Sequence, residues 1–508
     1  MGLIDAISAR FPSVGEPKTH ISFKSRLKWT GIILLLYLGL GQIILYGISA
    51  TSKTQFQFYD VVLGSSIGSL MTLGIGPIVT ASIILQLLVG SGLIPWNLRT
   101  LDGKKKFQNT QKLMVILFAV FEAFAYVSFG AVRPASADIG LFVFLIIQLA
   151  VGGVLVLFMD EVVSKWGIGS GVSLFIAAGV TRQIFIRTFN PLTPEGSTVP
   201  AGIIPQFISL MGMGELMQAF LALIPLLGTI IVFLIVVYVQ GMKVEIPLAF
   251  GSIRGFARRW PLNLIYTSNI PVILVAALLA NLQLMGSMTA TTTTEGGMKC
   301  GILGCYDPTS GQAQSGLVTF FTAPRSLPVA VFFLTFLGVI FIVALLSFFM
   351  RMKGGMKTVG IAAIGGLVLA ILVSLTTLGL PTGEQFLHVL IYLIILTVGS
   401  MIFSIFWVAT SGMDSRSVAE QIEGMGMQIP GFRRDPRIVE EVLQRYIPTL
   451  TILSGLFIGI LASVADFTDA VGTGTGILLT AMIIYNLYEN IAGRYMEDMH
   501  PAFRKFFS

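Results

Sequence analysis

The chain has 508 residues, of which 55% are hydrophobic and only 11% carry a charge, against about 25% in soluble globular proteins. This composition excludes a soluble globular protein and indicates an integral membrane protein. The formal net charge of +7 is no sign of nucleic-acid binding on its own, because membrane proteins concentrate Lys and Arg in their cytoplasmic loops.

A basic leader, residues 1–28, precedes the first apolar run. Apolar residues recur in it at helical spacing, which predicts a cytoplasmic N-terminal segment with an amphipathic helix on the inner leaflet. They are Leu3, Ile4, Ile7 and Phe11. A loosely ordered tail is the alternative. No small-residue cleavage site follows the apolar run, so we expect a retained first span rather than a signal peptide.

Twelve runs of roughly 17 or more apolar residues follow, each long enough to cross a hydrocarbon core about 30 Å thick. They are Trp29 to Ser49, Gly74 to Ile94, Leu113 to Gly130, Gly140 to Met159, Gly167 to Ile186, Phe220 to Val239, Tyr266 to Met285, Leu327 to Met350, Val359 to Leu380, Phe386 to Ala409, Ile447 to Ala465 and Val471 to Tyr488. We therefore expect an all-α membrane protein with twelve spans.

One further apolar segment, Phe56 to Leu70, is too short to be a span. As a helix it would reach only about 22 Å, so it must enter the membrane region and stop. Half-length backbone at membrane depth is tolerated only where protein surrounds it or where it borders a water-accessible cavity. A hollow in the protein is therefore expected.

The positive charges predict the orientation of the spans. With the N-terminus inside, 26 of the 32 Lys and Arg residues fall on cytoplasmic segments. The six outer ones are Lys53, Arg133, Arg182, Arg187, Lys299 and Arg325. We therefore expect both termini to be cytoplasmic.

The two cysteines of the chain, Cys300 and Cys305, lie in the long outer loop between Met285 and Leu327. An oxidising exterior permits a disulfide there, and a free pair is the alternative.

Two pairs of spans share sequence patterns. The fifth span begins with GIGSGVSLFI at Gly167, and the last begins with GTGTGILLT at Gly472. The second span contains PIV at 77–79, and the seventh contains PVI at 271–273. In the predicted topology the members of each pair run in opposite directions, as an inverted repeat requires. Chance similarity between glycine-rich spans is the alternative.

Spans eight and nine form a hairpin at 327–380, joined by a short basic turn. Because a hairpin can be inserted without reversing anything downstream, we expect a ten-span inverted repeat with an added pair. The predicted halves are 29–190 and 220–488, separated by an outer loop at 191–219 and followed by a cytoplasmic segment at 489–508.

Several long motifs carry a family resemblance. They are TLGIGPIVT at 72–80, QLLVGSG at 86–92, DEVVSKWGIGSG at 160–171, FIAAGV at 175–180, SNIPVI at 268–273, GFR at 431–433 and YIP at 446–448. These motifs resemble the SecY family, the central subunits of protein-conducting translocons, and are most similar to its archaeal members. The resemblance covers nearly the whole chain outside about 287–386. It implies a passive conduit that passes secretory polypeptides and releases transmembrane segments sideways into lipid.

The resemblance implies a constriction of six apolar side chains at mid-membrane. The matching positions are Ile75, Val79, Val172, Ile176, Ile273 and Leu479. A narrow apolar ring holds water poorly and so would resist ion leakage. Without the resemblance, each of these would be an ordinary packing residue of an apolar helix.

The half-length segment, 56–68, matches the plug of the family, which sits on the outer side of the ring and moves aside during transport. The plug positions are Phe56, Phe58, Tyr59, Val62 and Ser65. A short outer helix without a gating role is the alternative.

A lateral gate is implied between the second and third spans on one side and the seventh span and Phe386 to Ala409 on the other. Three polar side chains lie along this seam, namely Thr80, Glu122 and Asn281. A carboxyl group within a span is costly, so we expect Glu122 to be neutral or hydrogen-bonded to such neighbours. Fastening of a static bundle is the alternative role.

Two cytoplasmic loops, 241–263 and 411–444, are longer than a connection demands. The family docks the ribosome through these loops, and guanidinium groups suit RNA phosphates. The candidate docking residues are Arg254, Arg258, Arg259, Arg433 and Arg434. The alternative is that inner loops are basic in any case.

Further partners implied by the resemblance are a SecE or gamma-type subunit, a beta or SecG-type subunit, signal sequences, nascent polypeptides and the lipid of the cell membrane. We expect no cofactor, no metal and no enzymatic activity, since G-x-x-x-x-G-K-[ST] and G-x-S-G motifs do not occur. A twelve-span secondary transporter is the alternative, because inverted repeats and glycine-broken spans are also typical of that class. An aliphatic ring, however, is poorly suited to recognising a small polar solute.

Overall fold

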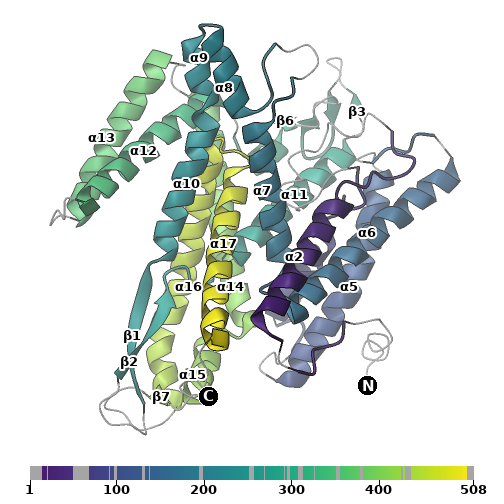
Figure 1. Cartoon of the computed structure of the whole chain (residues 1–508), viewed down its shortest axis with the longest axis vertical. Coiled ribbons are helices and arrows are strands. Elements are labelled where there is room, and N and C mark those ends of the chain that lie inside the picture. Colours follow the sequence, from purple (N-terminus) through teal and green to yellow (C-terminus); the bar gives the residue numbers. More distant parts are fainter. Residues whose placement is uncertain are drawn as a thin grey trace.

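The computed structural model is built largely of helices (Figure 1). It describes residues 14–19, 21–49, 68–90, 92–96, 100–128, 132–136, 138–193, 198–250, 257–267, 269–290, 292–293, 298–306, 313–324, 326–349, 355–377, 381–424, 427–428 and 436–499. The predicted N-terminal amphipathic helix and the plug positions 56–65 lie outside these residues.

The described residues of the first half contain α2 (Phe23–Leu40), α4 (Gly76–Gly90), α5 (Leu101–Ser128), α6 (Ile139–Trp166) and α7 (Gly171–Phe189). Helices α8 (Ile203–Gly212) and α9 (Leu216–Ala222) connect it to the second half. That half contains α10 (Ile224–Gln240), α11 (Ile270–Thr289), the 3-10 helix η2 (Leu317–Phe321), α12 (Leu327–Phe349), α13 (Gly355–Thr377), α14 (Gly383–Ser411), α15 (Ser415–Gly424), α16 (Pro436–Phe467) and α17 (Gly474–Met499).

Local start and stop signals account for several helix ends. Helix α6 begins after Asp138, whose carboxylate accepts the N–H of Gly140 at 3.2 Å. Helix α14 begins with a capping box formed by Thr382 and Gln385, and it ends at Gly412 in the left-handed conformation, with φ 72°.

Seven helices of the described chain are long and apolar enough to cross a membrane. They span Asp102–Ser128, Ile139–Trp166, Gly171–Phe189, Leu216–Gln240, Ile270–Ser287, Gly383–Glu423 and Arg437–Phe467. The other five predicted spans are carried by α2, α4, α12, α13 and α17. Helix α17 continues to Met499, past the predicted boundary at residue 488.

Helix α4 is shorter than the predicted span Gly74 to Ile94. Turns occupy residues 68–75 before the helix begins at Gly76, and Gly92, with φ 78°, follows its end. The turns hold Met71, Leu73 and Ile75 almost fully buried, so protein rather than lipid surrounds this non-helical backbone.

The predicted outer loop at 191–219 is partly helical, since it contains α8 and the start of α9. Short strands, which the all-α prediction did not include, form two small sheets among the connecting residues that the structure describes. One has the order β2-β1-β7, with β1 (Lys243–Phe250), β2 (Ala257–Asn263) and β7 (Met427–Gln428). The other has the order β3-β4-β5-β6, with β3 (Thr292–Thr293), β4 (Lys299–Cys300), β5 (Cys305–Tyr306) and β6 (Ala313–Ser315).

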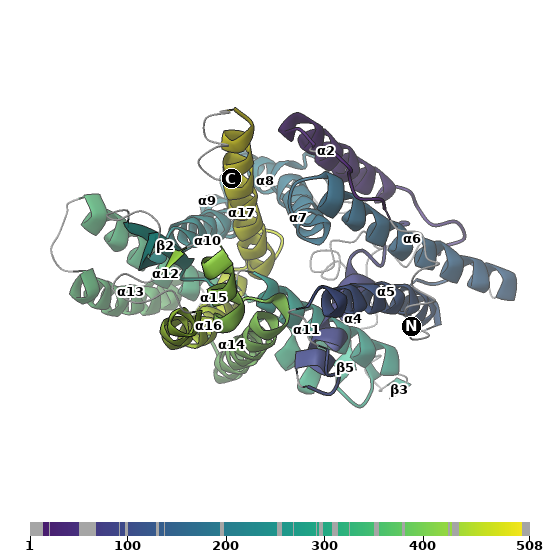
Figure 2. The same cartoon turned by 90° about the horizontal axis from the view of Figure 1, so that it is seen from below.

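The two halves stand side by side. Seen from below, α2, α4, α5, α6 and α7 occupy the right of the molecule, and α10, α12, α13, α14, α16 and α17 occupy the left (Figure 2). The main buried apolar cluster draws residues from both halves, so the core lies where they meet. Helices α12 and α13 form a hairpin, and α12 also packs against α10 and α16.

Candidate functional site

The two pairs of spans that share sequence patterns are in contact at the junction of the halves: α7 packs against α17, and α4 packs against α11. Helix α7 leads up to α8 at the top of the view, whereas α17 descends toward the lower edge, so the two run in opposite directions (Figure 1). This is the arrangement expected of an inverted repeat.

Alignment of α7 with α17 by their first helical residues differs from their alignment by sequence pattern. The pattern aligns Gly167 with Gly472, whereas the first helical residues are Gly171 of α7 and Gly474 of α17. The two alignments differ by two residues. In the structural register the predicted ring residues Ile176 and Leu479 are equivalent, because each lies five positions after the first glycine of its helix.

The six predicted ring residues converge on one apolar cluster. Five of them are members of the main buried cluster, and Val172 is half-buried and packs against it. Ile75 is the most deeply buried, with no exposed surface. The side chains come from α7, α11, α17, and α4 with the turn that precedes it, so both halves contribute. The structure therefore packs the six predicted ring side chains together in an apolar environment.

The three predicted gate residues are brought together from three helices. The hydroxyl of Thr80 on α4 donates to Oε1 of Glu122 on α5 at 2.9 Å, and Nδ2 of Asn281 on α11 donates to the same hydroxyl at 3.2 Å. Helix α14 packs against both α4 and α11, which completes the predicted seam. The carboxyl group of Glu122 therefore has the hydrogen-bonded neighbour that its place in a span demands.

The predicted plug side chains, Phe56, Phe58, Tyr59, Val62 and Ser65, lie outside the described residues. The chain that follows them is anchored. The N–H of Leu45 donates to the carbonyl of Gly68 at 3.0 Å, and the N–H of Gly68 donates to the Thr72 hydroxyl at 3.1 Å.

The two long loops that are predicted to be cytoplasmic meet in one sheet. Strand β7 of the second loop pairs with the end of β1 of the first, at Ala249–Gln428 and Phe250–Met427. Arg258 and Arg259 lie on β2, opposite Leu248 and Pro247 of β1, while Arg254, Arg433 and Arg434 lie outside the described residues.

An ion pair ties this sheet to the bundle. Lys243 at the start of β1 donates to Glu489 on α17 at 3.0 Å. This bond to Glu489 raises the pKa of Lys243.

Cys300 and Cys305 are joined by a disulfide that links β4 to β5. Next to it, the hydroxyl of the buried Tyr306 donates to the carbonyl of Gln283 on α11 at 3.3 Å, and burial raises the pKa of Tyr306 to about 12. The sheet β3-β4-β5-β6 is therefore fastened to α11, which carries the predicted gate residue Asn281.

The same loop contacts both α11 and α14, the helices of the second half that border the predicted gate. The Gln283 side chain on α11 donates to the carbonyl of Phe321 in η2, and a ring nitrogen of His388 on α14 lies 2.9 Å from the carbonyl of Thr322. His388 thus contacts a backbone group 66 positions away in the chain.

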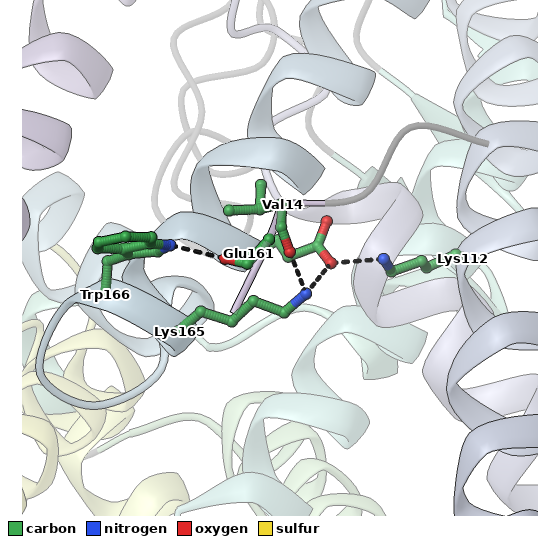
Figure 3. A network of polar contacts seen from close by, with 6 residues as sticks. Val14, Lys112, Glu161, Lys165 and Trp166 are labelled. Atoms are coloured by element: carbon green, nitrogen blue, oxygen red, sulfur yellow. Dashed lines mark hydrogen bonds and ion pairs between the residues drawn. The ribbon is translucent and has the colours of Figure 1, made fainter. Parts of the chain in front are cut away.

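A charged network at the lower end of α6 was missed by the sequence analysis (Figure 3). Glu161 accepts from Lys112 of α5 at 2.5 Å and from Lys165 at 2.8 Å. Lys165 also donates to the carbonyl of Val14, and Trp166 donates to the carbonyl of Gly15 at 2.9 Å. The four-residue spacing of Glu161 and Lys165 was the available signal, and the other contacts are tertiary.

No group of three His, Cys, Asp or Glu side chains placed to hold a metal ion occurs in the described part of the chain. Buried polar clusters do occur. The Thr267 hydroxyl, for example, lies 2.7 Å from that of Ser454 and 3.2 Å from that of Ser404.

Comparisons with known proteins agree with this geometry. A family model described as SecY matches residues 69–488, and one described as the plug domain of Sec61p matches residues 35–68. Protein translocase subunit SecY of Methanothermobacter thermautotrophicus is 42% identical over 506 residues, which cover 97% of this chain and 96% of that protein. The same subunit of Pyrococcus furiosus is 39% identical, over 99% of this chain and 98% of that protein.

Solved structures are similar over the same extent. A protein-conducting channel has a TM-score of 0.77 at 37% identity, and the match covers 99% of each chain. Sec61 in the canine ribosome-channel complex from the endoplasmic reticulum has a TM-score of 0.74 at 37% identity, again over 99% of each chain. With a family model matched over most of its length and full-length relatives near 40% identity, the chain belongs to the SecY family.

Proposed function

We propose that this chain is the central, pore-forming subunit of a protein-conducting channel. It passes unfolded secretory polypeptides across the membrane and releases transmembrane segments sideways into lipid. The observation that carries the proposal is the convergence of six apolar side chains from both halves on one buried cluster. A ring of this kind excludes water and ions when idle and can yield around a chain of any sequence, because it makes no directional bonds.

The lateral exit is proposed at the seam of α4 and α5 with α11 and α14. The Thr80 hydroxyl links Glu122 to Asn281 across this seam, and these hydrogen bonds help to hold it shut. An arriving apolar segment can compete with such bonds, since each contributes only about 0.6–1 kcal/mol in membrane proteins. The segment 56–68 is proposed as the plug, in keeping with the plug-domain match to residues 35–68.

The sheet β2-β1-β7 unites the two cytoplasmic loops, and we propose that they dock the ribosome together. The likeness to Sec61 in a canine ribosome-channel complex supports this assignment. We further propose a cell-membrane location, cytoplasmic termini, and two small partner subunits of the SecE or gamma type and the beta or SecG type. A channel of this kind is a conduit rather than an enzyme.

A twelve-span secondary transporter finds no support in the relatives described above. Such a transporter would need polar groups presented to a solute at mid-membrane. The buried carboxylate of Asp466 is engaged by Tyr392 and by the first turn of α17 instead.

Crosslinking of a stalled nascent chain to single cysteines tests the function. Ile75→Cys and Ile273→Cys place a cysteine in the proposed ring. Ile230→Cys on α10 is the control, because Ile230 is 48% exposed and is not a ring residue. The native cysteines do not interfere, because they are paired. We expect adducts at both ring positions and none at Ile230. A nascent chain that crosses the membrane without touching either ring position would refute the pore assignment.

A further inference from the structure

The two ring-bearing helices α7 and α17 begin in the same way, although they belong to opposite halves. In each case an aspartate near the end of the preceding span reaches the first turn of the next helix. Oδ1 of Asp160 on α6 accepts the N–H of Val172 at 2.9 Å. Oδ1 of Asp466 on α16 accepts the N–H of Thr475 at 2.8 Å. Val172 and Thr475 are the second residues of α7 and α17.

The first glycine of each helix lies very close to the backbone at or next to the aspartate. A Cβ atom added to Gly171 would lie 2.6 Å from Cα of Asp160, and one added to Gly474 would lie 1.9 Å from the carbonyl carbon of Ala465 and 2.2 Å from the backbone N of Asp466. Only glycine lets the start of the helix press against the backbone that carries the aspartate. Carboxylate, amide and glycine thus form one motif that occurs twice, once in each half.

In each helix a predicted ring residue follows the motif by about one helical turn. Ile176 and Leu479 each lie four residues after the capped amide, about one turn along the same face of the helix. A carboxylate at a helix N-terminus bonds otherwise unpaired N–H groups and is favoured by the helix dipole. Each aspartate therefore restrains both the depth and the rotation at which its helix presents a ring side chain.

The copy in the second half has additional contacts. Oδ2 of Asp466 accepts the hydroxyl of Thr475, and it also accepts the hydroxyl of Tyr392 on α14 at 2.7 Å. Asp466 is only 4% exposed, and removal of its carboxylate would leave these buried donors without their acceptor.

We propose that Asp160 and Asp466 are a symmetry-related pair of positioning residues that hold α7 and α17 in the orientation at which the apolar ring is closed. This inference rests on the proposed pore function. The two aspartates do not line the ring. They act on it by fixing the helices that carry Ile176 and Leu479.

The test is the ion leak of the idle, purified complex in sealed vesicles, measured for Asp160→Ala, Asp466→Ala and the double variant. Loss of one charge-assisted bond corresponds to a change of about tenfold in an equilibrium constant. We expect each single variant to raise the leak severalfold and the double variant to raise it further. Translocation of a secretory protein should be retained, because the ring side chains themselves are unchanged.

Matched controls separate positioning from general damage. Glu161→Gln alters the neighbouring carboxylate, which contacts Lys112 and Lys165 rather than α7, and Tyr392→Phe removes one donor to Asp466 but leaves both contacts from α17. Both controls should show a wild-type leak. Controls that leak as much as Asp160→Ala and Asp466→Ala would overturn the proposal.

Asparagine variants keep the proposal testable if the alanine variants do not assemble. Asp160→Asn and Asp466→Asn retain an acceptor oxygen but lose the charge, so we expect a leak between those of the wild type and the alanine variants. A wild-type leak in both asparagine variants would overturn the inference.

The ring itself is tested alongside with Ile176→Gly and Leu479→Gly. If these variants leak while the aspartate variants do not, the positioning role is wrong and the pore assignment stands. If neither the glycine variants nor the aspartate variants leak, the ring assignment fails, and the proposed positioning role fails with it.

Discussion

Asn281 on α11 donates a hydrogen bond of 3.2 Å to the hydroxyl of Thr80 on α4, so one side-chain contact joins the two sides of the proposed lateral gate. The proton of that hydroxyl is directed to Glu122 at 2.9 Å, which leaves a lone pair free to face Asn281. Thr80 is thus the shared member of the network, and loss of its hydroxyl removes both bonds at once.

We expect Thr80→Val to weaken the closed gate. Loss of about 0.6–1 kcal/mol from the bond across the seam shifts the balance of closed and open states about threefold to fivefold. Weaker signal sequences should then support translocation. Thr80→Ser, which keeps the hydroxyl, is the matched control. Replacement of both Glu122 and Asn281 by Leu should also move the signal-strength threshold, and an unaltered threshold would count against the gate.

Deletion of residues 58–66 should leave a folded channel that leaks ions when idle, because the plug would no longer support the ring from its outer side. Ion flux through the idle protein in vesicles measures the effect. A Gly-Ser segment of the same length is the control for a shortened loop, and it should leak as well, since it lacks the apolar side chains. Ion permeability of the deletion variant equal to that of the wild type would refute the plug assignment.

Charge reversal at both Arg254 and Arg433 should lower ribosome affinity by at least about tenfold and make the remaining binding less dependent on salt, because fewer phosphate contacts release fewer counterions. Arg445→Glu is the control. Arg445 is exposed on α16, where it pairs with Glu441 at 3.3 Å. Unchanged affinity in the double variant, measured by co-sedimentation over a salt series, would refute the docking assignment.

Gly152→Ala should destabilise the protein by about 2 kcal/mol or more, because the added Cβ would lie 1.9 Å from the carbonyl oxygen of Leu70. That contact lets α6 approach the turns that precede α4 and carry Ile75. Gly31→Ala is the matched control. A Cβ at Gly31 of α2 meets nothing within 4 Å, so this change should be neutral or stabilising by up to about 1 kcal/mol. Thermal unfolding of the two variants in detergent measures the difference, and equal melting temperatures would contradict it.

Length and periodicity of apolar runs were sufficient to predict where the membrane helices lie, because lipid admits few alternatives to a continuous helix. Each of the twelve predicted spans overlaps a helix in the described structure, although α2 ends at Leu40, nine residues before the predicted end of the first span at Ser49. Helix ends were less predictable. Helix α5 begins at Leu101, twelve residues before the predicted span, because Lys is compatible with a helix beyond the hydrocarbon core. The helix at 203–212 was missed within a segment interpreted as a loop.

The motifs of the sequence also predicted ring and gate residues, and the structure brings the members of each set together. The linear chain was therefore sufficient to predict the class of protein and the approximate placement of its helices. The residues at the constriction stay a prediction. The repeat pattern indicated two related halves, but its alignment was two residues away from the register of the helix starts.

Only the tertiary structure decided which groups meet across large separations in the chain. The network of Asn281, Thr80 and Glu122 joins residues up to 201 positions apart. The paired contacts of Asp160 and Asp466 with the starts of α7 and α17 depend on the close approach of glycine backbones, which no residue pattern reports. Hydrogen bonds act only over about 3 Å, so they reveal a site only after packing has brought distant segments together.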